Sequence, residues 1–259
     1  MLTKRTWGTT TRTLLCGLMM SSLCGCEPRN DTSETADLGI ISGTAGNDVR
    51  QSFHMDAWAD NWFAAYLVDE LIVEDRVSIA TERSFNAESI TFDGVYPLSL
   101  NFILKDFREN DTGLEYIGRR NQQMGDGGFI MQLTETRSGR VVAVSNAEWK
   151  CIVIHEAPLD KSCEREAHPV AGTAPCEFTS RDAPQGWKAS DFDDSGWDNA
   201  TVYSVREVNP RRGYDEIDWA ESAELIWGPD LETNNTLLCR VTVEAPGSNG
   251  FVQLADANN

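Results

Sequence analysis

The sequence predicts an all-β protein built as a sandwich of short antiparallel strands. Residues 98–106 alternate between apolar and polar side chains, which is the pattern of a strand with one buried face. Turn-forming pairs such as Asp93-Gly94 separate the apolar runs. These turns recur roughly every ten residues, a spacing typical of sandwiches and jelly rolls. We therefore expect a jelly-roll β-sandwich in a single domain.

The strands are expected in a regular order along the chain. Residues 129–133 and 141–144 form a hairpin around a turn at 137–140. Residues 156–186 carry four prolines and are expected to be irregular. The expected strands are 52–55, 88–92, 98–106, 129–133, 141–144, 149–154 and 237–243.

Residues 56–75 are the densest apolar and aromatic run after the N-terminal segment, and their pattern is ambiguous. Trp58, Trp62 and Tyr66 recur every four residues, which favours a helix. The same run also alternates in a strand period and contains Leu71-Ile-Val73, which favours β structure. Propensity alone favours the helix, whereas the position of the run among strands favours a hairpin that turns near Asp69-Glu70.

The N-terminus is predicted to be a lipoprotein signal. Lys4 and Arg5 precede an apolar run that is too short to span a bilayer of about 30 Å. The run ends in Leu23-Cys-Gly-Cys26, which resembles a bacterial lipobox with cleavage before Cys26. Acylation of Cys26 would attach the protein to a membrane without a spanning segment. Because Glu27 rather than Asp follows, we expect the outer membrane of the cell envelope.

These features divide the chain into four parts. The segment after the signal is polar and rich in Gly, Ser and Thr, so it is predicted to be a flexible tether. The expected parts are signal 1–25, tether 26–47, β-sandwich 48–245 and polar tail 246–259.

The formal net charge of −19 excludes one class of partner. A strongly acidic surface repels phosphate backbones and anionic headgroups, so nucleic acid is not expected to bind. Neutral sugars, cations and basic proteins remain open as ligands.

Four cysteines remain after the signal and Cys26 are set aside. An even number in an exported protein predicts two disulfides. We expect Cys163–Cys176 to close a proline-rich loop and Cys151–Cys239 to join two strands. A zinc site is the alternative, but the spacing of the cysteines does not support it.

Several short motifs follow one another along the chain, at 59–69, 101–104, 128–133, 139–140, 148–150 and 187–200. In this order they resemble the galactose-binding-like β-sandwich modules that are attached to many bacterial glycoside hydrolases. The match spans most of residues 49–243. It departs from those modules at Asp69-Glu70, where they carry Asn-Gly, and in the cysteine-bearing insertion after Ile154.

The resemblance implies that the acidic turn 191–198 is structural, with carboxylates capping backbone amides and Trp197 packed on the sheet. The alternative is a structural calcium site at Asp191, Asp193 and Asp194, since hard cations take clustered oxygen ligands. The capping role is preferred, because the spacing lacks the glycine and distal glutamate of a calcium-binding loop. No other cofactor is expected.

Aromatic side chains in loop-like sequence supply the candidate ligand site. Tyr214, Asp215, Asp218 and Trp219 combine rings with carboxylates, as carbohydrate-binding faces do. Trp149, Trp187, Trp197 and Trp227 are instead expected to fill the core.

No catalytic residues are predicted. His155-Glu156 is not followed by the second histidine of a zinc protease, and no nucleophile elbow or phosphate loop occurs. The expected function is therefore a lipid-anchored, non-catalytic binding protein for carbohydrate or another envelope ligand. The alternatives are an assembly lipoprotein that binds a protein partner through its acidic surface and an accessory subunit of a glycoside hydrolase.

Overall fold

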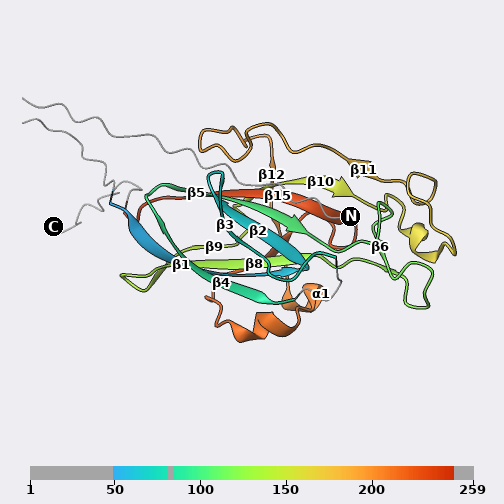
Figure 1. Cartoon of the computed structure of the whole chain (residues 1–259), viewed down its shortest axis with the longest axis horizontal. Helices are drawn as coiled ribbons and strands as arrows, with labels where there is room; N and C mark the ends of the chain where they lie inside the picture. Colours follow the sequence, from blue (N-terminus) through green and yellow to red (C-terminus); the bar gives the residue numbers. More distant parts are fainter. Residues whose placement is uncertain (1–48, 81–84, 248–259) are drawn as a thin grey trace, which may run out of the picture. The chain divides into compact units, whose positions relative to one another are not determined.

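The computed structural model describes residues 49–80 and 85–247, all of which belong to one compact unit. The predicted signal, Cys26, the tether and the tail from residue 248 lie outside the described residues. Two antiparallel sheets stack face to face (Figure 1), so the predicted all-β sandwich is confirmed.

The first sheet has the strand order β13-β14-β8-β1-β4, with β9 also paired to β8. The chain enters it at β1 and returns to it repeatedly, so most neighbours in the sheet are distant in sequence, and β8 and β9 form a hairpin. Its strands are β1 (Gln51–Asp60), β4 (Ala87–Gly94), β8 (Gly128–Glu135), β9 (Arg140–Val144), β13 (Thr201–Tyr203) and β14 (Leu225–Trp227).

The second sheet has the strand order β11-β10-β15-β5-β2-β3, with β12 also paired to β10. A separate two-stranded ladder joins β6 (Leu114–Glu115) to β7 (Gln123–Met124). The strands of the second sheet are β2 (Trp62–Leu67), β3 (Glu70–Glu74), β5 (Leu98–Lys105), β10 (Lys150–Glu156), β11 (Thr179–Ser180), β12 (Asp198–Asn199) and β15 (Asn234–Val243).

The core lies between the two sheets and follows the predicted alternation. Leu98, Leu100, Phe102 and Leu104 of β5 are fully buried between the layers. Trp149 and Trp227 are also buried there, as expected, and the Trp149 ring packs against Phe102 at a centroid distance of 4.8 Å. Burying a large apolar side chain contributes about 1.5–3 kcal/mol, so these residues account for much of the folding free energy.

Residues 56–75 form strands, not a helix. β1 runs through Asp60, the chain then crosses to the other sheet, and β2 and β3 form the predicted hairpin. The turn is at Val68-Asp69, one residue before the predicted position. The four-residue spacing of the aromatics misleads because the run belongs to both sheets: Trp58 lies in β1, whereas Trp62 and Tyr66 lie in β2.

The outer face of the second sheet is covered by the long connection that carries β11 and β12 (Figure 1). Trp187 and Trp197 are both 7% exposed and pack on Leu238, together with isoleucines of β5 and β10. Both tryptophans are therefore buried as predicted, although on the outside of a sheet and not between the sheets.

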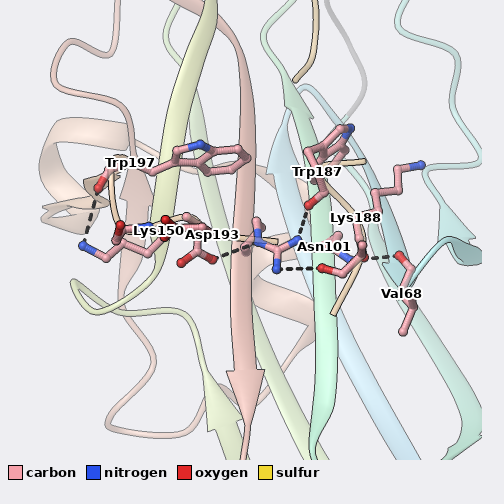
Figure 2. Close-up of polar contacts among 11 residues, drawn as sticks. Val68, Asn101, Lys150, Trp187, Lys188, Asp193 and Trp197 are labelled. Atoms are coloured by element: carbon pink, nitrogen blue, oxygen red, sulfur yellow. Dashed lines mark hydrogen bonds and ion pairs between the residues drawn. The ribbon is translucent and has the colours of Figure 1, made fainter. Parts of the chain in front are cut away.

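Two polar side chains under this connection hold it to the sheet. Arg240 of β15 is 4% exposed, and its guanidinium donates to Asp194 Oδ2 at 2.8 Å, to Asn101 Oδ1 at 2.9 Å and to the carbonyl oxygens of Trp187 and Ala189. Asn101 in turn donates to the Val68 and Lys188 carbonyl oxygens at 2.8 and 3.0 Å (Figure 2). Every one of these groups is paired, as buried polar groups usually are.

Both predicted disulfides are present. Cys151 of β10 lies directly opposite Cys239 of β15 and is bonded to it. Cys163 and Cys176 are bonded 13 residues apart, and they close the irregular loop after β10. Such bonds stabilise a fold mainly by restricting the unfolded chain.

The helical segments are short. They are a 3-10 turn at Lys161–Arg165, α1 (Val205–Val208) and a second 3-10 turn at Arg212–Glu216. Ser204 and Glu207 form a capping box that starts α1, which lies below the first sheet in Figure 1. Within the described ranges, no helix has the length and apolar character needed to cross a membrane.

Candidate functional site

One end of the sandwich gathers loops and buried polar side chains. β1 ends at Asp60, which pairs with Gly128 at the start of β8. In the other sheet, Lys105 at the end of β5 pairs with Trp62 and Thr236. The strand ends of both layers therefore meet at this end, which we call the loop end, and the 106–127 connection covers it.

Two carboxylates are buried at the loop end, and three of their four oxygens lack a hydrogen-bond partner. Asp60 and Asp106 are each 2% exposed. Neither carboxylate oxygen of Asp106 has a hydrogen-bond partner, nor does Oδ1 of Asp60. Such groups are costly, because an ionised carboxylate loses its hydration when it is buried.

Burial and neighbouring acids raise the pKa of both groups well above the usual range. For Asp60 the largest cause is burial, followed by the charges of Asp126 and Glu115, while Arg211 acts in the opposite direction. For Asp106 the causes are burial and then the charges of Asp60, Glu115 and Asp126. The Phe107 amide, whose hydrogen bond goes to Asn61 Oδ1, lowers the pKa of Asp106, and this is the smallest of the contributions.

The backbone of residues 125–128 closes tightly over these acids, which explains its glycines. A Cβ atom on Gly125 would lie 1.6 Å from Asp106 Oδ2, and one on Gly127 would lie 2.2 Å from the Trp227 ring. Only glycine fits at these two positions. Asp126, which lies between them in the sequence, is therefore held close to the buried carboxylates.

An acidic cleft of about 580 Å³ opens on the outside of the same loop. Gly125 and Asp126 form part of its wall, and Met124 and Tyr203 supply apolar surface. The cleft carries five carboxylates and one amine, and the acids are Asp126, Glu164, Glu207, Asp230 and Glu232.

The single amine of the cleft is already neutralised. Lys161 Nζ lies 2.7 Å from Asp230 Oδ2 and 2.6 Å from Glu232 Oε2. Partial burial lowers the pKa of Lys161, but the bonds to these two acids outweigh it and raise the pKa above its ordinary value. Glu207 is engaged in the capping box with Ser204. Asp126 and Glu164 remain as the acids best placed to meet a ligand.

A second cleft, of about 500 Å³, lies at the opposite end between β9 and the end of β15. Its wall consists largely of β9 and residues 241–247, with Trp149 at one side. It has no comparable concentration of charge, so the acidic cleft is the better candidate site.

The predicted ligand residues lie elsewhere, on the outer face of the first sheet. The Tyr214 ring packs edge-on against Trp58 at 5.7 Å, and its centroid is 5.9 Å from that of Trp219. Trp219 Nε1 donates to the Tyr214 carbonyl oxygen at 2.9 Å. Both rings are half-buried, whereas Asp215 and Asp218 are exposed beside them. The structure thus brings the four residues together, with part of each ring used in packing.

Two of the three predicted calcium ligands, Asp193 and Asp194, accept hydrogen bonds from the protein itself. Asp193 accepts from the Ser195 amide at 3.0 Å, and these hydrogen bonds lower the pKa of its carboxyl. Asp194 accepts from Arg240, and Asp191 is exposed. In the described part of the chain, no three His, Cys, Asp or Glu side chains form a preformed metal site.

His155 is buried within a polar network at the loop end. It pairs with Asn235 Oδ1 at 3.0 Å and Asp111 Oδ1 at 3.2 Å, and its ring stacks on Phe178. Burial and then Arg108 lower the pKa of His155. These contacts are those of a structural histidine.

Sequence reasoning missed Asp60, Asp106 and Asp126. With 41 acidic residues in the chain, no single carboxylate stands out. The available signals were that Asp60 and Asp106 lie at the ends of mostly apolar stretches and that Asp126 lies among three glycines.

No protein-family model matches the chain, and neither does any curated protein or solved structure at the level that would indicate common ancestry.

Proposed function

We propose that this chain is an exported, non-catalytic binding protein whose acidic cleft takes a cationic ligand. The observation that carries the proposal is the charge of the cleft, in which five carboxylates face one amine that is already paired with two of them. A concave surface of one sign concentrates its field and attracts ligands of the opposite sign. The ligand class that fits best is a lysine- or arginine-rich segment of an envelope protein.

The proposal includes the location and the fold type. Cys26 is the proposed site of lipid attachment, and the outer membrane is the proposed location, on the strength of the lipobox-like motif. The two-layered antiparallel sandwich is consistent with a galactose-binding-like jelly roll. Modules with that architecture commonly bind ligands without catalysis, which agrees with the absence of a recognisable catalytic motif in the sequence.

The experiment is a titration with a fluorescent oligolysine peptide at low and physiological ionic strength. We expect binding that weakens with salt and that falls about tenfold in the Asp126→Asn, Glu164→Gln double variant, which corresponds to about 1.4 kcal/mol. The control is the Glu70→Gln, Glu74→Gln double variant, which removes the same charge from the exposed strand β3. Equal losses in the two variants would show that only net charge matters and would refute the cleft.

Carbohydrate binding, in a stand-alone protein or in an accessory subunit of a glycoside hydrolase, is the second candidate. It is favoured by the Tyr214–Trp219 ring pair, which has exposed carboxylates beside it at Asp215 and Asp218. A glycan array tests it: binding to a defined sugar that disappears in Trp219→Ala supports this candidate. Binding that instead follows Asp126 and Glu164 supports the cleft.

A further inference from the structure

The starting observation is an uncompensated buried charge. Asp106 is 2% exposed, and both of its carboxylate oxygens lack a hydrogen-bond partner. The neighbouring Asp60 has the same exposure and one unpartnered oxygen. A native protein rarely leaves buried polar atoms unsatisfied, so such atoms indicate an additional ligand, which for a carboxylate is a proton or a cation.

The protein supplies little positive charge to balance these two acids. Arg211 is exposed, and its effect on the pKa of Asp60 is the smallest of the contributing causes. The other charged groups that face the pair are acidic: Glu115 of β6 and Asp126 before β8. The like charges of Asp60, Asp106, Glu115 and Asp126 come from four separate segments, and a divalent cation bound to the two buried acids would offset their repulsion.

The loop 125–128 separates the two buried acids from the acidic cleft. A Cβ atom on Gly125 would overlap Asp106, so the Gly125 backbone lies directly against that carboxylate. Gly125 also lines the acidic cleft. Asp126, next to it, also lines the cleft and acts electrostatically on both buried acids. A cation that enters the cleft thus has one loop between it and the buried pair.

We propose that Asp60 and Asp106 bind a calcium ion at the loop end of the sandwich, with entry from the acidic cleft. No three acidic or histidine side chains are preformed around one point in the described residues. Main-chain oxygens and water therefore complete the coordination, which calcium, with roughly six to eight oxygen ligands in a flexible geometry, accepts. Magnesium demands a stricter octahedron and zinc prefers nitrogen and sulfur, so both fit the site less well.

This site differs from the acidic turn of residues 191–194, where the sequence suggests calcium. It also does not depend on the ligand proposed for the cleft, because it uses the acids behind the loop. Since the carboxyls must ionise to bind the ion, calcium binding releases protons and strengthens as the pH rises.

The test is thermal unfolding of the full chain, purified in detergent, at pH 7.5 in EDTA and in 1 mM calcium. We expect calcium to raise the Tm by about 5 °C and the same concentration of magnesium to raise it less. Asp106→Asn and Asp60→Asn should each abolish the calcium shift, because each removes a charged ligand at constant size. Asp191→Asn, which neutralises an exposed acid of the other candidate site, should keep the full shift.

A second measurement needs no variant. Terbium, which replaces calcium, is excited by energy transfer from a nearby indole, and the Trp227 ring packs directly against Gly127. We expect terbium luminescence on excitation at the tryptophan band, and its displacement by calcium. The proposal is overturned by an unchanged Tm together with no sensitised terbium emission, by a calcium shift that survives both Asp60→Asn and Asp106→Asn, or by one that Asp191→Asn abolishes.

Discussion

Two regions of this protein bury charged side chains, and they do so in opposite ways. On the outer face of the second sheet, Arg240 is 4% exposed, and its guanidinium contacts a carboxylate, an amide oxygen and two carbonyl oxygens. At the loop end, Asp106 is 2% exposed and its oxygens have no hydrogen-bond partner. The burial is nearly equal, so the difference lies in the partners.

This difference separates a structural role from a ligand-binding one. A buried cation that satisfies several acceptors fixes one arrangement of the groups around it. The partners of Arg240 belong to β5 and to the connection over the sheet, so the network fastens that connection in place. An unpaired acid fixes nothing and destabilises the fold unless something else binds it. The first region explains how the fold is held, and the second is where we propose that a cation binds.

The largest expected loss of stability comes from removing Arg240, the buried charge that is fully paired. Arg240→Met should lower the free energy of unfolding by about 3 kcal/mol, because Asp194, Asn101 and two carbonyl oxygens lose their donor in a buried place. Denaturant unfolding measures this loss. The matched control is Arg50→Met, whose ion pair with Asp93 joins side chains that are 73% and 55% exposed, and it should cost less than about 0.5 kcal/mol. Similar losses in the two variants would contradict a fastening role for Arg240.

The second largest loss of stability is expected from a change at Gly125, whose backbone lies against the unpaired Asp106. In Gly125→Ala the new methyl group would overlap Asp106 Oδ2, and the carboxylate is too deeply buried to swing into water. We expect a loss of about 2 kcal/mol in the free energy of unfolding and loss of the calcium response. Gly196→Ala is the control, since nothing lies within 4 Å of its added methyl group and its stability should change by less than about 0.5 kcal/mol. A neutral Gly125→Ala would mean that the loop does not close on Asp106.

The third substitution, Asp106→Asn, is expected to raise the free energy of unfolding and not to lower it. Because the pKa of Asp106 is raised in the folded protein, the folded state keeps a proton that the unfolded state releases as the pH rises above about 4. In EDTA the wild type should therefore lose stability as the pH rises from 4 toward 8. Asp106→Asn cannot ionise, so at pH 8 it should be more stable than the wild type by about 1 kcal/mol.

Urea unfolding of both proteins across this pH range, in EDTA, tests the sign. The advantage of Asp106→Asn should shrink toward pH 4 and below, where the wild-type carboxyl becomes protonated in the unfolded state as well. Part of the pH dependence should remain in the variant, because Asp60 still titrates. An advantage that grows on acidification would contradict the assignment of an uncompensated charge to Asp106.

The comparison also explains which features the sequence could predict. The strands of the core follow from a local pattern, since the alternation in residues 98–105 repeats every second residue. The disulfides follow from the number of cysteines and from their place in strands and loop. The turn between β2 and β3 was located to within one residue, although the aromatic spacing of the same run suggested a helix.

Neither buried charge could be predicted in this way. Arg240 and Asn101 are 139 residues apart, and only the pairing of β15 with β5 brings them together. Asp60 and Asp106 come from different sheets and meet only because β1 and β5 end on the same side of the sandwich. Arg240 directly follows apolar strand residues and Asp106 is separated from them only by Lys105, so the sequence around them does not reveal which charge is paired.

The smallest expected loss of stability is at Lys188, and it tests how far the Arg240 network extends along the connection over the second sheet. Lys188 lies in the connection over the second sheet, and its Nζ is 3.1 Å from the centroid of the Tyr66 ring. Partial burial lowers the pKa of Lys188, while Asp69 acts in the opposite direction. Because water still reaches this ammonium group, Lys188→Met should cost only about 0.5 kcal/mol in the free energy of unfolding, and added salt should reduce that cost. A loss as large as that of Arg240→Met would mean that the fastening network extends to the edge of the sheet, so that Arg240 is one of several anchors and not its centre.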